Sequence, residues 1–283
     1  MSGLATIAGY ALRESIRRRV LTVVCVLTAV FLGLYGWATS AVFDDVRDSA
    51  GGLPLDEQVL AGATLLGLAM FVTLFLGVVL AVFLTLGAVR GDAERGLLQP
   101  LVVRPVGRRT LLAGRFLASA GVCAAYVLVV YTIALLLTGL IGGFWPGAIV
   151  TPALGLAGAV AIVVALALLG TTLLSATANG IAIFMLFGAG LTGGLLGQIG
   201  GALDSDTLDT ISKVAIWALP FEGLYQDALH ALTADIDGVT GIAVQLGPFG
   251  GAADASAALL LWAVVYAGLA ILAAVRVFAR ADL

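Results

Sequence analysis

The sequence predicts an all-α membrane protein with six transmembrane helices. Hydrophobic residues make up 61% of its 283 residues, and charged residues only 11%. The apolar residues gather in uninterrupted runs of about 20 or more, the length that a helix needs to cross a hydrocarbon core of ~30 Å. The charged residues are sorted between the two ends of these runs, as in multi-pass proteins. We therefore interpret residues 1–283 as a single transmembrane domain.

An amphipathic elbow helix is predicted at residues 1–19. Apolar residues from Leu4 to Ile16 recur at helical spacing, and Arg13, Glu14 and Arg17 fall on another face. This pattern is typical of a helix that lies in the headgroup plane. The apolar run that follows is too long for the core of a cleavable signal, so we expect it to be retained as the first span.

The six spans are predicted from the apolar runs and from the residues that separate them. The segment from Gly142 to Pro152 breaks the third run from the fourth, and the small polar cluster from Ser175 to Asn179 breaks the fourth from the fifth. The predicted spans are residues 20–42, 59–89, 116–141, 153–174, 180–203 and 255–275.

The distribution of charge predicts that both termini are cytosolic. Of the 14 lysines and arginines, 12 fall before the first span, between Arg90 and Arg115, or after the last span. By the positive-inside rule, these three segments face the cytosol. Of the 17 acidic residues, 13 fall in the two opposite segments, residues 43–58 and 204–254. The location that we expect is a prokaryotic cytoplasmic (inner) membrane.

The sequence lacks the residues that several classes of function require. The 88 residues from Phe116 to Leu203 contain no Asp, Glu, Lys, Arg or His, whereas proton relays place such groups within their helices. The phosphate-binding motif GxxxxGK[ST] is absent, because the only lysine is Lys213, in ISKVA. With no cluster of cysteines and histidines, we expect no metal site, no catalytic residue and no enzyme activity in this chain. An ion-coupled carrier that binds sodium through backbone carbonyls remains an alternative.

The charged segment from Arg90 to Arg115 has the character of a docking element. Asp92 can cap a short helix that runs to Leu98, where Pro100 stops it. The surface of this helix would mix charged with apolar side chains, which suits a cleft in a partner protein. The alternative is an ordinary positive-inside loop that contacts lipid phosphates.

The same segment carries a resemblance to a known family. The stretch AERGLLQPLVVRPVGRRTLLAGRFLA resembles the cytoplasmic loop of the membrane subunits of ATP-binding-cassette (ABC) exporters, in the type-two permease family that includes the nitrous-oxide reductase maturation permease. Gly107 replaces the usual serine, and Arg115 stands where lysine is common. The residues that match the pattern are Glu94, Gly96, Leu97, Arg104, Pro105, Val106, Arg108 and Arg115.

The resemblance implies a function. The chain would be the permease subunit of an ABC exporter, driven by two copies of a separate ATPase subunit that bind ATP and Mg, and it would pair with a second permease copy or a paralogue. Besides these partners we expect membrane lipids, and neither a cofactor in this chain nor nucleic acid. The alternatives are a non-transporting membrane scaffold or assembly factor and, third, an ion-coupled carrier. The coupling residues implied are Asp92, Glu94, Arg95, Gly96, Leu97, Leu98, Arg104, Pro105 and Arg108.

The fifth predicted span is unusually rich in glycine. Small residues spaced four apart let another helix approach closely, either in a dimer or within one chain. The glycines that we assign to possible dimer packing are Gly190, Gly193, Gly194, Gly197 and Gly201.

Aromatic residues in the second and fifth spans suggest a translocation path. Phe71 and Phe75 share one helix face, as do Phe184 and Phe187, although such rings can also face lipid or the core. A lining of this kind suits an amphipathic or hydrophobic substrate better than a bare ion.

The predicted outer segment, residues 204–254, contains apolar residues at helical spacing after Pro220. We expect one or two short helices there, which lie on or dip into the outer leaflet. They would act either as a gate over the path or as a simple interfacial cap.

Overall fold

The structure, a computed structural model, describes residues 19–49, 56–86, 108–245 and 252–280. Within these ranges it consists of helices with no strand, and six helices are long and apolar enough to span a membrane. The predicted fold class is confirmed to this extent. The predicted elbow helix lies outside the described residues except for Arg19, which begins the first span.

The six spans follow the predicted order. Five of the six helices are longer than the predicted runs, because polar or charged residues at their ends continue the helices, whereas α3 ends at Thr85, before the predicted end at residue 89. The spans are α2 (Arg19–Ser49), α3 (Glu57–Thr85), α5 (Arg108–Gly142), α6 (Val150–Leu173), α7 (Ala176–Leu203) and α11 (Ala257–Arg280).

Local chemistry explains where these helices begin and end. Asp56 caps α3, because its carboxylate accepts a 3.1 Å hydrogen bond from the backbone N–H of Val59. The helix α7 ends at Asp204, whose φ of 52° lies in the left-handed region. The predicted break between the fourth and fifth spans is narrower than expected. It comprises only Leu174 and Ser175, which are both extended, and Asn179 lies inside α7.

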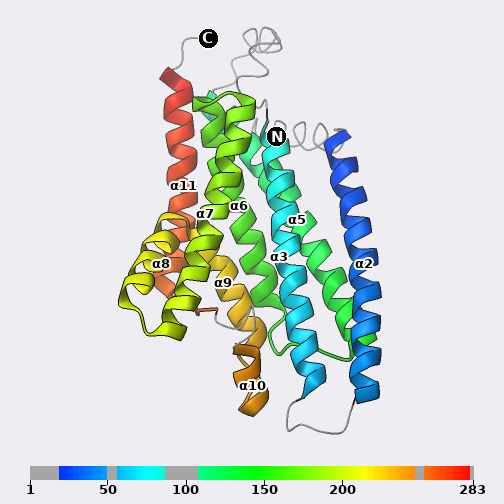
Figure 1. Cartoon of the computed structure of the whole chain (residues 1–283). Coiled ribbons are helices and arrows are strands. Elements are labelled where there is room, and N and C mark those ends of the chain that lie inside the picture. Colours follow the sequence, from blue (N-terminus) through cyan, green and yellow to red (C-terminus); the bar gives the residue numbers. More distant parts are fainter. Residues whose placement is uncertain (1–18, 50–55, 87–107, 246–251, 281–283) are drawn as a thin grey trace.

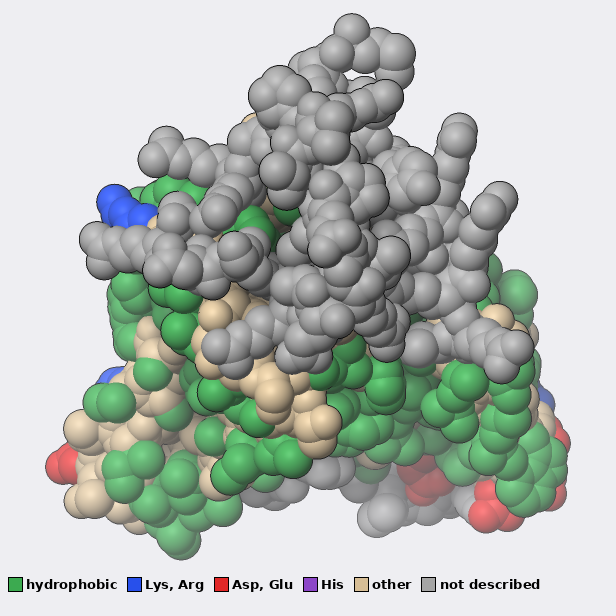
Figure 2. Space-filling view, turned by 90° about the horizontal axis from the view of Figure 1, so that it is seen from above, with side chains coloured by type: hydrophobic (Ala, Val, Ile, Leu, Met, Phe, Trp, Pro, Cys, Tyr) green, Lys and Arg blue, Asp and Glu red, His purple; other side chains and the backbone are tan. Residues whose placement is uncertain are grey.

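The helices α3 and α6 form the centre of the bundle. Both are apolar around their whole circumference, which is typical of a helix buried on all sides. The helix α6 contacts α3, α5 and α11, while α2 and α11 leave much of their surface uncovered. Figure 2 shows hydrophobic side chains over most of the visible flanks of the bundle. Such a surface suits contact with lipid.

The beginning of α2 and the end of α11 lie at the same end of the bundle, at the top of Figure 1. At this end the chain also leaves α3 and enters α5. We call this end the terminal end, and the opposite end, which carries α10, the α10 end. The described helix ends that adjoin the three arginine-rich segments therefore lie together, as the charge pattern predicts. That this end is cytosolic remains a prediction.

Three helices connect α7 to α11: α8 (Asp206–Ala218), α9 (Pro220–Thr233) and α10 (Gly238–Gln245). The helix α8 doubles back along α7, and α9 then returns towards the α10 end while packed against α6 (Figure 1). Pro220 at the first position of α9 suits the sharp turn, because proline has no N–H that a helix start would leave unpaired. One or two short helices were predicted in this segment, whereas its described residues form three, of which α9 packs against α6.

Candidate functional site

The coupling residues lie almost entirely outside the described residues. Of the nine that the sequence implies, only Arg108 is described, as the first residue of α5. The helices that flank the segment are informative, since α3 belongs to the buried centre and α5 packs against both α3 and α6. Any force applied to the segment would reach the core of the bundle directly.

Three of the four phenylalanines assigned to the path come together. The ring centroid of Phe75 on α3 lies 6.4 Å from that of Phe184 and 6.2 Å from that of Phe187, both on α7. The ring of Phe187 in turn stacks on Phe221 of α9 at 5.8 Å. Phe71 is half-buried and packs against the hydrophobic core. We call Phe75, Phe184, Phe187 and Phe221 the aromatic cluster.

The aromatic cluster is exposed on one side only. The side chain of Phe75 is 40% exposed, whereas that of Phe187 is 4% exposed and that of Phe221 is 1% exposed. The cluster therefore has a buried base that fixes its position and an accessible ring on α3. Rings at these separations attract one another beyond the effect of burial alone.

Four of the five glycines assigned to dimer packing lie against helices of the same chain. A Cβ atom on Gly190 would lie 2.5 Å from the ring of Phe221, and one on Gly193 would lie 2.4 Å from Cβ of Ala215. Gly194 and Gly197 meet side chains of α9 and α8 in the same way, whereas Gly201 has nothing within 4 Å. The within-chain contact thus accounts for these four residues. Dimerisation through α7 remains a prediction, with Gly201 on an open face.

A buried polar cluster occupies the space that Gly194 leaves. Nε2 of Gln226 donates a 2.7 Å hydrogen bond to Oε1 of Glu222, and Nε2 of Gln198 donates a 3.3 Å bond to Oε1 of Gln226. The side chain of Glu222 is only 1% exposed. Its Oε2 atom has no hydrogen-bond partner among the described residues. We call Glu222, Gln226 and Gln198 the polar triad.

The surroundings of Glu222 favour the neutral carboxyl group. Burial raises the pKa of this group above the ordinary glutamate value, and the hydrogen bond from Gln226 offsets only part of the rise. A neutral carboxyl group is far less costly to bury than a carboxylate with no counter-ion. Glu222 is therefore an ionisable group inside the bundle, carried by a helix that does not span it.

Glu222 and Gln226 were not predicted as functional residues, because both lie between the fifth and sixth apolar runs and not within a predicted span. A signal was nevertheless present, because Glu222 and Gln226 are four residues apart among the apolar residues that follow Pro220. Polar groups at that spacing share a helix face, and on a helix whose neighbouring residues are apolar this spacing indicates a buried polar pair.

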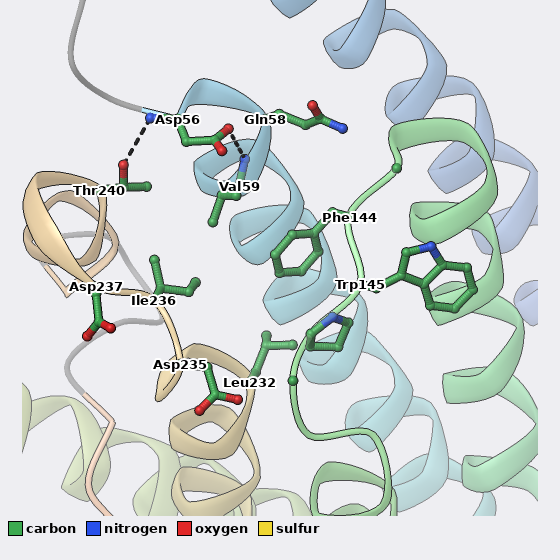
Figure 3. A pocket seen from close by; sticks show the side chains of 13 residues that line it. Asp56, Gln58, Val59, Phe144, Trp145, Leu232, Asp235, Ile236, Asp237 and Thr240 are labelled. Carbon is green, nitrogen blue, oxygen red and sulfur yellow. Dashed lines mark hydrogen bonds between the residues drawn. The ribbon is translucent and has the colours of Figure 1, made fainter.

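A pocket of about 460 Å³ opens at the α10 end, between α3, the α5–α6 connection and the α9–α10 connection (Figure 3). Three carboxylates line it, those of Asp56, Asp235 and Asp237. The carboxylate of Asp56 is engaged in capping α3, and the backbone N–H of Asp56 donates a 2.9 Å hydrogen bond to Oγ1 of Thr240. The bond to Thr240 fastens α10 to the start of α3. The gate and the interfacial cap both remain predictions for this part of the outer segment.

The fold defines a class of protein. Of the six helices that can span a membrane, α3 and α6 form a buried central pair, and the shorter helix α9 packs against α6 from one end of the bundle. The protein is thus a multi-pass membrane protein.

Comparison with known proteins narrows this class. A family profile described as ABC-2 family transporter protein matches residues 5–283. The chain belongs to this family, whose members form the transmembrane part of ABC transporters and rely on an ABC ATPase as partner. The match is to the family as a whole and does not assign the chain to the nitrous-oxide reductase maturation group. A search of curated proteins found no match.

Proposed function

We propose that the chain is the permease subunit of an ABC exporter for an amphipathic or hydrophobic substrate. Family membership over residues 5–283 is the observation that carries the proposal. Two ATPase subunits, which bind ATP and Mg, would supply the energy, and two permease copies, or this chain and a paralogue, would enclose the path. The transporter would reside in a prokaryotic cytoplasmic membrane.

Coupling would occur through the segment between α3 and α5. ATP-driven closing of the ATPase subunits would push on residues 92–98 and reorient the two permease bundles, in an alternating-access cycle. The burial of α3 supports this mechanism, because a helix packed against α2, α5 and α6 transmits displacement to all three. The oppositely charged Glu94 and Arg95, beside apolar Leu97 and Leu98, would fit a cleft with both polar and apolar walls.

The substrate class follows from the accessible side of the aromatic cluster. Phe75 and Phe184 present rings from two different spans, and a bare ion would find no polar ligand on either ring. An amphiphile could instead slide its apolar part along these rings. The polar triad lies behind the cluster on α7 and α9 and could serve a polar head during passage.

The decisive experiment measures coupling. The ATPase that co-purifies with the permease from native membranes would be reconstituted with it in proteoliposomes, and ATP hydrolysis and movement of a fluorescent amphiphile would be recorded together. Substitutions Glu94→Ala and Leu97→Ala should leave ATP hydrolysis running while transport falls at least about tenfold, which corresponds to a loss of about 1.4 kcal/mol of coupling.

A matched control comes from the α10 end. Lys213 is an exposed residue whose Nζ atom forms a 3.0 Å ion pair with Asp209, and Lys213→Ala should not alter coupling. A chain that purifies with no ATPase would support the scaffold or the ion-coupled carrier. Unchanged coupling in both Glu94→Ala and Leu97→Ala would remove the docking role of this segment.

A further inference from the structure

A second hollow lies on the flank of the bundle, remote from the aromatic cluster. It is a groove of about 590 Å³ between α6, α9 and α11, with Phe116 of α5 at one end. Apart from Thr151 and Asp227, its walls are glycine and apolar side chains. Because both α6 and α11 are membrane spans, lipid is the surrounding solvent. We call this hollow the lateral groove.

The length of the lateral groove matches one leaflet of a bilayer. Along α11 its lining runs from Leu260 to Ile271, which corresponds to about 17 Å at the rise of an α-helix. Half of a hydrocarbon core of ~30 Å is about 15 Å, the depth that one acyl chain reaches. The groove therefore has room for a single acyl chain that enters from the α10 end.

Two glycines, Gly268 and Gly158, keep the lateral groove open. A Cβ atom on Gly268 would have nothing within 4 Å, although this residue lines the groove. On the facing helix, Gly158 has only the tip of Leu224 nearby, at 3.1 Å. A side chain at position 268 could therefore begin without a clash and extend into the groove.

Moving an acyl chain from the bilayer into the lateral groove would release little free energy, since the surrounding lipid tails are as apolar as the walls of the groove. Selectivity must come from the polar end, where Asp227 lies. Oδ1 of Asp227 accepts a 3.0 Å hydrogen bond from the backbone N–H of Ala255, and the carboxyl group of Asp254 lies beside it. The described neighbourhood of Asp227 thus holds two carboxyl groups and one half-buried histidine, His230.

This arrangement favours a cation over an anion. Burial and the neighbouring carboxyl group of Asp254 raise the pKa of Asp227, while the bond from Ala255 and the field of His230 lower it. The side chains of Asp227 and Asp254 are hydrogen-bonded, so without a cation the two carboxyl groups share a proton, whereas a positive group beside them lets both ionise. A primary ammonium group satisfies both, because it carries a positive charge and three hydrogen-bond donors.

We propose that the lateral groove binds one acyl chain of a phospholipid with a primary ammonium headgroup, and that Asp227 and Asp254 hold this headgroup. The phospholipid belongs to the leaflet at the α10 end. This site does not depend on the proposed transport function, since neither the ATPase nor a transported substrate is needed to occupy it.

Native mass spectrometry tests the site directly. The purified, delipidated protein would be incubated with equal amounts of phosphatidylethanolamine and phosphatidylglycerol that carry identical acyl chains, and the lipids retained per chain would be counted. We expect the wild type to retain phosphatidylethanolamine with a preference of about tenfold, the effect of one charge-assisted hydrogen bond.

Three variants separate the tail from the headgroup. Gly268→Leu should fill the lateral groove and abolish the preferentially retained lipid. Gly121→Leu is the matched control, since Gly121 on α5 is exposed, has nothing within 4 Å and does not line the groove. Asp227→Asn keeps an oxygen that accepts the bond from Ala255 but removes the charge, so lipid should still bind while the preference falls towards one.

Each other result would overturn the proposal. A wild type without headgroup preference would remove the role of the two carboxylates. Equal retention by Gly268→Leu and Gly121→Leu would place the bound lipid elsewhere. A change of oligomeric state in Gly268→Leu alone would show that a second copy of the chain, and not a lipid, covers the groove. If Gly268→Leu did not fold, the Asp227→Asn preference would decide the matter alone.

Discussion

The side-chain amide of Gln226 donates a 2.7 Å hydrogen bond to Oε1 of Glu222, one turn earlier on α9. This bond lies against α7 at Gly194, where a Cβ atom would come within 2.1 Å of Oε1 and 2.6 Å of Nε2 of Gln226. A side chain at position 194 would therefore collide with this polar pair. One oxygen of the Glu222 carboxyl group accepts a hydrogen bond from its own helix, and the absence of a side chain at Gly194 on α7 leaves space for it.

The first prediction concerns pH. The pKa of Glu222 is raised by burial, so the folded state keeps its proton to a higher pH than the unfolded state does. The contribution of Glu222 to the free energy of unfolding is thus greatest below the ordinary glutamate pKa of about 4.3 and falls as pH rises through the raised pKa. Each unit by which folding raises the pKa of Glu222 corresponds to about 1.4 kcal/mol in the free energy of unfolding.

Glu222→Gln should remove this dependence. Thermal unfolding midpoints of the wild type and Glu222→Gln would be measured in lipid–detergent micelles from pH 5 to pH 8. The two midpoints should change with pH in parallel at the acidic end of this range. As pH rises further, the midpoint of the wild type should fall more than that of Glu222→Gln. Parallel curves over the whole range would mean that Glu222 does not change its proton affinity on folding.

The second prediction concerns close packing on α7. In Gly193→Ala the new Cβ would meet Cβ of Ala215 at 2.4 Å, and this neighbour has no side-chain torsion by which to move away. We expect a loss of about 1–3 kcal/mol in the free energy of unfolding, as for other overpacked sites. Gly201→Ala, on the same helix with nothing within 4 Å, should be neutral or slightly stabilising. Unfolding by denaturant in mixed micelles measures both, and equal effects would contradict the packing of α8 on α7.

The apolar runs predicted the six spans because a bilayer imposes a length and a polarity on every helix that crosses it. The polar helix ends were harder to place. Apolar runs stop at the first charged residue, whereas α2 continues through Asp44, Asp45 and Arg47 to Ser49. Helical hydrogen bonds do not depend on hydrophobicity, so α2 extends beyond the end of its apolar run and α5 begins well before the start of its run.

The re-entry of α9 was only partly predictable. The apolar residues after Pro220 indicated a helix with one buried face, but they did not identify its partner. That partner is set by contacts between distant residues, such as the approach of Ala228 to Gly155 on α6. For the same reason the glycines of α7 were predicted as close contacts, while the choice between a dimer and the same chain needed the fold.

The third prediction uses Asn179, which is fully buried at the start of α7. Its Nδ2 atom donates a 3.0 Å hydrogen bond to the carbonyl oxygen of Ala167 on α6. Asn179→Ala should lower the free energy of unfolding by about 1 kcal/mol. Gly170→Ala should cost more, because its Cβ would come within 1.8 Å of Oδ1 of Asn179.

A double-mutant cycle makes this test specific. The three atoms nearest to a Cβ on Gly170 all belong to Asn179. In the Asn179→Ala background, the cost of Gly170→Ala should therefore largely disappear, which gives a coupling energy of about 1 kcal/mol or more. Additive costs in the double variant would show that the two residues do not touch.

The last prediction separates the path from the core within the aromatic cluster. The side chain of Phe75 is 40% exposed, so Phe75→Ala should change the free energy of unfolding little but reduce transport of a fluorescent amphiphile severalfold. Phe187 is 4% exposed, and Phe187→Ala should cost about 3–5 kcal/mol as a buried aromatic residue does. Phe83 is the matched control, since it lies on α3 outside the cluster and is also 40% exposed. Transport that falls equally in Phe75→Ala and Phe83→Ala would show that the rings of α3 act only through lipid contact, and the path would then have to lie elsewhere.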